Sequence, residues 1–196
     1  MKLVFCGGGA LGSHALYLAR SLGDDVRLAV IDDDRVETKN LVSQWLVKPM
    51  VGKNKATALK LQMGNFFGRQ IEAFPVRLGT HNVRELLGQA DLVIDAFDNG
   101  ASRQVIQDFV RETETSCVHA GLAADGGFGA VRWDRDFVID HEPIEGQATC
   151  EGGEFLPLIV QVSASVVEAI REFRANALET SWNIHPRGAE AFKLSL

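Results

Sequence analysis

The chain has 196 residues, of which 46% are apolar and 23% are charged, and its formal net charge is −6. These values predict one globular domain, 1–196, with a tail at about 175–196. They give no basic face for nucleic acid, and no apolar stretch reaches the ~18 residues that a membrane span needs. Three scattered cysteines and no signal-peptide pattern predict a cytoplasmic protein without a disulfide framework.

The first predicted elements form a βαβ unit. Residues 2–6 are an apolar run that stops at three glycines, which is typical of a buried strand ending in a tight turn. Apolar residues recur at helical spacing over 11–22, and a β-like run at 26–31 ends at an acidic triplet. A strand, a glycine turn, a helix and a second strand predict parallel pairing with a right-handed crossover.

Strands and helices continue to alternate along the rest of the chain. Helices are expected at 55–63, 83–87, 102–112 and 156–174, and strands at 70–75, 91–96 and 116–119. The glycine-rich stretch 121–129 precedes a hairpin expected between 130–133 and 136–139. We therefore predict an α/β fold: a Rossmann-like, mostly parallel sheet, with helices on both faces and a few antiparallel strands near the C-terminal half.

The turn after the first strand has the pattern G-x-G-x-x-G. Gly7 is expected to make the turn, Gly9 to let the backbone approach a phosphate, and Gly12 to let helix and strand pack closely. The helix that follows offers free N–H groups and a positive dipole end. Asp32, about 20 positions on, would accept hydrogen bonds from ribose hydroxyls. By themselves, these features fit an ATP-binding enzyme and an NAD-dependent oxidoreductase equally.

Four further blocks resemble the ThiF/MoeB/HesA family, which includes the ubiquitin-activating enzymes. That family carries D-x-D-x-V-x-x-x-N-L-x-R-Q and then a G-K-x-K-A segment, and this chain has DDDRVETKNLVSQ at 32–44 and GKNKA at 52–56. LVIDAFDN at 92–99 with Arg103, and Cys150 followed by ASVVEAIR at 164–171, also agree. The blocks keep the family's order, and the similarity extends from residue 2 to about residue 173.

The resemblance implies adenylation of the C-terminal glycine of a small ubiquitin-like or sulfur-carrier protein, with ATP and Mg²⁺ as cofactors. The residues it implies are Lys55 and Lys53 at the phosphates, Gln44 facing them, Asp34 and Asn40 in the nucleotide pocket, and Asp98 as the magnesium ligand. Cys150, in a polar glycine-rich stretch, is the candidate nucleophile for a later transfer of the carrier. The resemblance also implies a homodimer.

Ser43 departs from the family pattern, because an arginine normally occupies that position. A hydroxyl cannot take over the neutralisation of triphosphate charge by a guanidinium fork. This leaves open a second hypothesis, a non-catalytic relative that binds nucleotide or carrier as a scaffold. The third hypothesis, an NAD-dependent oxidoreductase, is disfavoured because such enzymes have no use for the phosphate-side blocks at 32–44 and 52–56.

Overall fold

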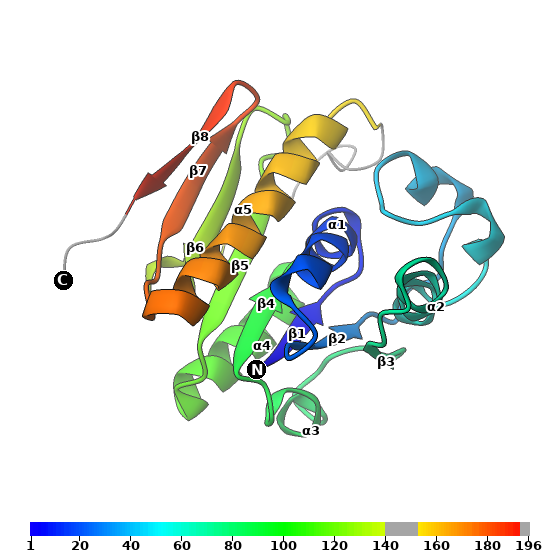
Figure 1. Ribbon diagram of the computed structural model, residues 1–196. Helices are drawn as coiled ribbons and strands as arrows, with labels where there is room; N and C mark the ends of the chain where they lie inside the picture. Colours follow the sequence, from blue (N-terminus) through cyan, green and yellow to red (C-terminus); the bar gives the residue numbers. More distant parts are fainter. Residues whose placement is uncertain (140–152, 193–196) are drawn as a thin grey trace.

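The computed structural model describes residues 1–139 and 153–192, and these form one eight-stranded sheet with helices on both faces (Figure 1). The strand order is β3-β2-β1-β4-β5-β6-β7-β8. Strands β1 to β5 pair in parallel, and β6, β7 and β8 are added in antiparallel fashion. The predicted fold class is confirmed.

The elements have the following bounds. The strands are β1 Lys2–Cys6, β2 Arg27–Ile31, β3 Glu72–Phe74, β4 Leu92–Asp95, β5 Cys117–Leu122, β6 Gly129–Trp133, β7 Ser181–His185 and β8 Gly188–Phe192. The α-helices are α1 Ala10–Ala19, α2 Lys55–Phe67, α3 Val83–Leu87, α4 Gly100–Thr113 and α5 Leu156–Asn176. Short 3-10 helices are η1 Arg20–Leu22, η2 Thr38–Val42, η3 Lys48–Met50 and η4 Asp134–Asp136.

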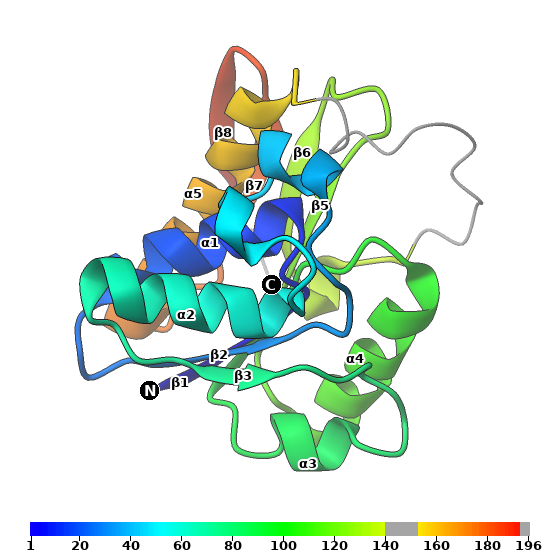
Figure 2. The ribbon, with the colours of Figure 1, turned by 90° about the vertical axis from the view of Figure 1, so that its right-hand side faces the viewer.

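The sheet separates two hydrophobic cores. Helices α1, α2 and α5 cover one face, and α3 and α4 cover the other (Figure 2). Alternate residues of β1 serve the two sides, so that Leu3 and Phe5 pack under the first group of helices and Val4 packs under the second. Every residue of β1 and β4 is buried, which explains why these strands appear in the sequence as continuous apolar runs.

The expected hairpin between 130–133 and 136–139 is wrong. Residues 129–133 do form a strand, β6, but its partners are β5 on one side and β7 on the other. The residues that follow β6 turn into η4 instead of returning along it. Both edges of β6 are therefore occupied by strands that lie elsewhere in the sequence, and β7 comes from the segment 175–196 that was expected as a tail.

The fold places the carboxyl ends of the neighbouring parallel strands β2, β1 and β4 at the same edge of the sheet. The chain passes from β1 outward to β2 and β3, and then returns to place β4 on the other side of β1. In open α/β sheets, ligands bind beyond the carboxyl ends of the strands where the order reverses in this way. Within the described residues, no helix combines the length and the apolar character needed to cross a membrane.

Candidate functional site

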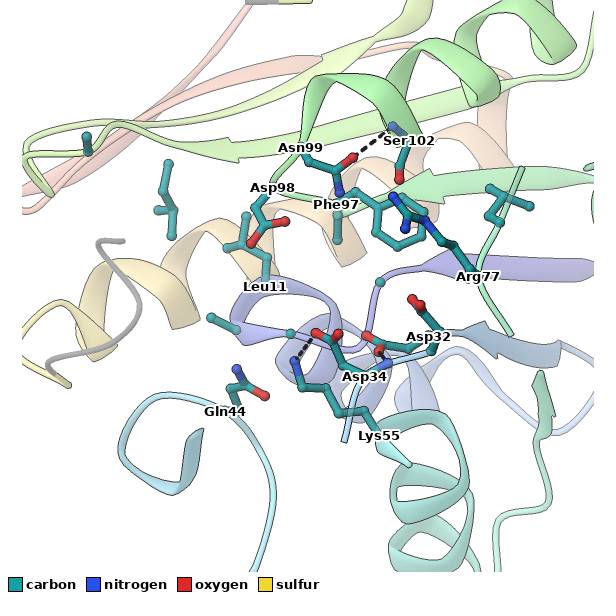
Figure 3. Close-up of a pocket in the computed structure, with 18 residues that line it drawn as sticks. Leu11, Asp32, Asp34, Gln44, Lys55, Arg77, Phe97, Asp98, Asn99 and Ser102 are labelled. Atoms are coloured by element: carbon teal, nitrogen blue, oxygen red, sulfur yellow. Dashed lines mark hydrogen bonds and ion pairs between the residues drawn. The ribbon is translucent and has the colours of Figure 1, made fainter. Parts of the chain in front are cut away.

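A pocket of about 580 Å³ opens at this reversal of strand order (Figure 3). Its walls come from the glycine turn, the acidic triplet, the end of β4 and the segment after β3. The lining residues are Gly7, Gly9, Ala10, Leu11, Asp32, Asp33, Asp34, Gln44, Lys55, Arg77, Leu78, Ala96, Phe97, Asp98, Asn99, Ser102, Leu122 and Ala124.

The glycine turn has the steric roles that its spacing predicts. Gly7 has φ +99°, a conformation that L side chains rarely adopt. A Cβ on Gly12 would lie 1.9 Å from the carbonyl oxygen of Gly7, whereas a Cβ on Gly9 would meet nothing within 4 Å. Helix α1 begins after Gly9, and no side chain caps it. Its first N–H groups therefore remain available to an anion in the pocket.

Asp32 joins the glycine turn to the end of β2. Its Oδ2 accepts a 2.7 Å hydrogen bond from the N–H of Gly8, and its Oδ1 accepts one of 2.8 Å from the N–H of Asp34. Burial raises the pKa of this carboxyl, and the positive charge of Lys55 and the two N–H donors oppose that rise. Each oxygen retains a second lone pair, so Asp32 can orient the turn and still accept a ligand hydroxyl.

Lys55 is the first residue of α2, and only 8% of it is exposed. Its Nζ donates a 2.8 Å hydrogen bond to Oδ2 of the exposed Asp34. The preceding residue, Asn54, caps α2 and also donates to the carbonyl oxygens of Asp32 and Asp34 at 2.8 and 3.1 Å. The start of the helix is thereby fixed to the acidic triplet, which places the ammonium group in the pocket (Figure 3).

Gln44 and Ser43 are neighbours with different environments. Gln44 lines the pocket, and its buried Oε1 has no hydrogen-bond partner within the described part of the chain. Ser43 is 1% exposed, does not line the pocket, and also has a buried hydroxyl without a partner there. The backbone oxygen of Ser43 lies 3.1 Å from Nε2 of His14. The residue that replaces the family arginine is therefore packed inside the protein.

The end of β4 forms the opposite wall of the pocket. Asp98 is exposed there and makes no hydrogen bond or ion pair with a described residue. Asn99 caps α4, because its Oδ1 accepts a 2.9 Å hydrogen bond from the N–H of Ser102. Asp98 lies across the pocket from Lys55 and Asp34 (Figure 3). A free carboxylate in this position offers the oxygen ligands that Mg²⁺ prefers.

The structure brings most of the predicted site residues together. Those that line the pocket are Gly7, Gly9, Asp32, Asp34, Gln44, Lys55 and Asp98. Asn40 does not line it, because its Oδ1 accepts from the N–H of Glu37 and closes a capping box at η2. Lys53 is exposed outside the pocket. Cys150 lies outside the described residues.

Arg77 also lines the pocket, although it lies outside the sequence motifs. Arg77 follows β3, and its carbonyl oxygen accepts a 2.9 Å hydrogen bond from Nδ2 of Asn82, whereas its guanidinium group makes no hydrogen bond or ion pair with a described residue. Together with Lys55, it supplies the cationic side chains among the described residues of the lining. The place of Arg77 after a parallel strand is the one signal that points to this edge of the sheet.

Comparisons with known proteins identify the family and the fold of this chain. The ThiF family model matches residues 1–166. The adenylyltransferase and sulfurtransferase UBA4 of Lodderomyces elongisporus is 36% identical over 140 residues, which are 68% of this chain and 30% of that protein. The sulfur carrier protein adenylyltransferase of Thermus thermophilus is 39% identical over 110 residues, which are 55% of this chain and 40% of that protein.

Among solved structures, E. coli MccB with ATP superimposes with a TM-score of 0.74 at 18% identity. That match covers 97% of this chain and 62% of the MccB chain, and it shows a shared fold. The matched regions span less than half the length of the two curated relatives.

Proposed function

The chain belongs to the ThiF family, and we propose that it uses ATP to adenylate the C-terminal carboxylate of a small carrier protein. One observation carries the proposal: a single pocket contains the N-terminus of α1, which no side chain caps, the Lys55 ammonium group, and the Asp98 carboxylate, which has no partner among the described residues. This combination suits a magnesium-bound triphosphate, because it supplies N–H donors, a cation and a hard metal ligand.

The pocket fits the size and polarity of a nucleotide. Its volume of about 580 Å³ falls inside the range of roughly 300–1,000 Å³ that is usual for small-molecule sites. The open space at Gly9 leaves room for a phosphate close to the backbone. Gln44 has an amide oxygen without a partner in the described part of the chain, on the side of Lys55, while Asp32 and Leu78 are available to the ribose and base.

In the proposed reaction, a carboxylate oxygen of the carrier's terminal glycine attacks the α-phosphorus of ATP. An acyl–O–P bond forms, the bond from the α-phosphorus to the bridging oxygen breaks, and its electron pair leaves with pyrophosphate. No proton is transferred. Because two anions must approach each other, positive charge between them lowers the barrier. Lys55 provides such a charge. Its ammonium group can bond to a phosphate oxygen in place of Asp34, because the Asp34 carboxylate is exposed and water solvates it after the exchange.

Asp98 is the residue that would hold magnesium. The metal, when bound, supplies positive charge beside the phosphate oxygens. The Asp98 carboxylate is exposed to the pocket and has no competing partner among the described residues, so it is available as a ligand. Asp98 is the third residue after the end of β4, and this short separation gives its backbone a defined place at the edge of the sheet.

The partner in this proposal is a ubiquitin-like or sulfur-carrier protein that ends in glycine. The name of the Thermus thermophilus relative, a sulfur carrier protein adenylyltransferase, supports that class of partner. A transfer of the activated carrier to Cys150 and a homodimeric assembly belong to the same proposal, and they rest on the family resemblance.

A specific observation favours a second candidate function, a scaffold that binds nucleotide without catalysis. Ser43 occupies the position of the family arginine, and its side chain is buried away from the pocket. Without that guanidinium group, the pocket has less positive charge with which to stabilise the transition state. The remaining groups of the pocket can still bind a nucleotide. Binding without turnover is the outcome that this candidate predicts.

An ATP–pyrophosphate exchange assay separates the two candidates. The probe is a β-grasp carrier protein that ends in glycine, supplied with ATP and Mg²⁺. We expect exchange that needs the carrier, its terminal glycine and the metal, and that is lost in Lys55→Ala. The matched control is Lys60→Ala, since Lys60 is an exposed lysine on the same helix. ATP binding without carrier-dependent exchange would instead support the scaffold.

A further inference from the structure

A buried ionic cluster lies beneath the segment that carries Asp98, outside the lining of the pocket. His119 on β5 is at its centre, and the side chain of this histidine is 0% exposed. Its Nδ1 lies 2.8 Å from Oδ2 of Asp95 on β4, and its Nε2 lies 3.1 Å from Oδ1 of Asp134 in η4. The three residues come from three separate elements, and the imidazole connects them.

The partners of the ring define its charge state. An ionised carboxylate only accepts hydrogen bonds, so a nitrogen that faces one must donate, and only imidazolium donates from both nitrogens. Burial opposes ionisation of Asp134, but hydrogen bonds from His119, Arg111 and Gln107 outweigh it and lower the pKa of Asp134 to about 2. Burial also opposes a charge on His119, and the bonds to the two carboxylates outweigh it and raise the pKa.

The cluster is not a nucleophilic triad, although Cys117 lies beside the ring. The Cys117 Sγ is 3.5 Å from Nε2 of His119, so the cysteine, the histidine and Asp95 have the composition of one. The thiol is buried, and its burial and the charge of Asp95 raise its pKa well above the ordinary value. Both ring nitrogens already have carboxylate partners, which leaves none to accept a proton from the thiol.

The same cluster holds both backbone polar groups of Phe97. Oδ1 of Asp95 accepts a 3.1 Å hydrogen bond from the N–H of Phe97. Arg103 on α4 donates from Nε to the carbonyl oxygen of Phe97 at 2.8 Å and from Nη2 to the carbonyl oxygen of Ala120 at 2.8 Å. Nη1 of Arg103 is 3.5 Å from Oδ2 of Asp95. Asp98 is the next residue along the chain, so its backbone N–H belongs to the peptide group whose carbonyl oxygen Arg103 holds.

Phe137 covers the cluster. Its ring stacks on His119 with centroids 4.0 Å apart and an interplanar angle of 7°, and the Arg103 guanidinium lies 5.2 Å from the same ring. This cover keeps water from the bonds between the imidazole and the carboxylates, which strengthens them. The arrangement gives the end of β4 a rigid support directly below the pocket.

We propose that His119 is a positioning residue for the nucleotide and metal site: as an imidazolium bonded to Asp95 and Asp134, it orients Asp95, which together with Arg103 fixes Phe97 and thereby places Asp98. The proposal rests on the proposed function, in that Asp98 is taken as the magnesium ligand. His119 touches neither nucleotide nor metal, so its effect is on the geometry of a residue that does.

Two measurements test this proposal. In ¹⁵N-histidine NMR spectra of the unaltered protein at pH 7, we expect the signals of His119 to show both ring nitrogens protonated. An unprotonated ring nitrogen at that pH would overturn the proposal. The second measurement is ATP binding by calorimetry at a series of Mg²⁺ concentrations, without carrier. His119→Gln and Asp134→Asn should raise the Mg²⁺ midpoint by about tenfold, the usual effect of losing a residue that orients a metal ligand.

The control is Asp108→Asn, which removes an exposed carboxylate on α4 whose one partner among the described residues is the side chain of Gln104. It should leave the Mg²⁺ midpoint unchanged. Folded His119→Gln and Asp134→Asn proteins with the unaltered midpoint would contradict the proposal. Asp134→Asn retains an acceptor for the ring, so it serves if His119→Gln does not fold. These assays contain no carrier and require no turnover. They therefore test the role of His119 even if the protein proves not to adenylate a carrier.

Discussion

Gly12 gives the sharpest test of how the glycine turn is built. In Gly12→Ala the new methyl carbon would be 1.9 Å from the carbonyl oxygen of Gly7. Real Cβ atoms essentially never come closer than 3.0 Å to such an atom, so the backbone of the turn or of α1 must move by about 1.1 Å. The obstacle is backbone and not the end of a flexible side chain, so rotation of a side chain cannot relieve it.

The expected cost follows from overpacking. Forcing a methyl group into a closely packed site costs typically about 1–3 kcal/mol. For a domain of this size, each kcal/mol lowers the melting temperature by roughly 2–4 °C, so we expect a decrease of about 2–12 °C. Displacement of Gly7 also distorts the anion site at the start of α1. We therefore expect Gly12→Ala to lower both the stability of the fold and the affinity for ATP with Mg²⁺.

Gly9→Ala is the matched control, because a Cβ there meets no atom within 4 Å. Loss of glycine at the helix N-cap costs at most about 1 kcal/mol, and reduced freedom of the unfolded chain returns about 0.4–1 kcal/mol. Its melting temperature should therefore stay close to that of the unaltered protein, while the methyl group in the pocket weakens ATP binding. Thermal unfolding by circular dichroism and calorimetric titration measure the two effects. An unchanged melting temperature in Gly12→Ala would refute the steric argument.

Further predictions concern charged and buried polar groups. Lys55→Ala should weaken calorimetric binding of ATP with Mg²⁺ by about 10- to 100-fold, because a charged hydrogen bond contributes about 1.5–3 kcal/mol; equal binding would contradict its role. Asp98→Asn should raise the Mg²⁺ midpoint of that binding, and an unchanged midpoint would exclude it as the ligand. Ser43→Ala should leave urea-unfolding stability equal or higher, because the lost hydroxyl is buried without a partner in the described chain; a marked loss would show a missed contact. The folded pKa of His119 is raised, so its stabilisation is present below pH ~6.5 and disappears as pH rises through that folded pKa. The folded pKa of Asp134 is lowered, so its stabilisation is present above pH ~3.9 and is lost as pH falls towards about 2. The stability difference between the unaltered protein and Asp134→Asn in urea should thus be largest between about pH 4 and 6.5, and a difference that is flat from pH 2 to 9 would contradict the assignment.

Local patterns predicted the parallel part of the fold because each signal there is contained in a few residues. After Lys2, all residues of β1 are apolar, since helices cover both faces, and the glycines that end the strand are required by backbone geometry. The pairing of β6 was not predictable in this way. Its second partner, β7, lies about fifty residues further along the chain, and nothing in the local alternation distinguishes that partner from a hairpin return.

The candidate site divides in the same manner. Gly7, Asp32 and Lys55 belong to contiguous motifs, and the structure places them in one pocket. Asn40 belongs to such a motif too, yet an amide suits helix capping as well as ligand binding, and the structure shows the capping. His119 was no more than a histidine at a strand end in the sequence, because its partners are 24 and 15 residues away.

The most direct test of the central claim is detection of the acyl-adenylate itself. The protein, ATP, Mg²⁺ and a glycine-ended carrier are mixed, and the carrier is examined by intact-mass spectrometry under conditions that preserve mixed anhydrides. We expect a carrier whose mass has increased by one adenylyl group. The unaltered protein and Lys60→Ala should form it, whereas Lys55→Ala should not, and a carrier lacking the terminal glycine should not be modified. A carrier of unchanged mass, in the presence of protein that demonstrably binds ATP, would contradict the account.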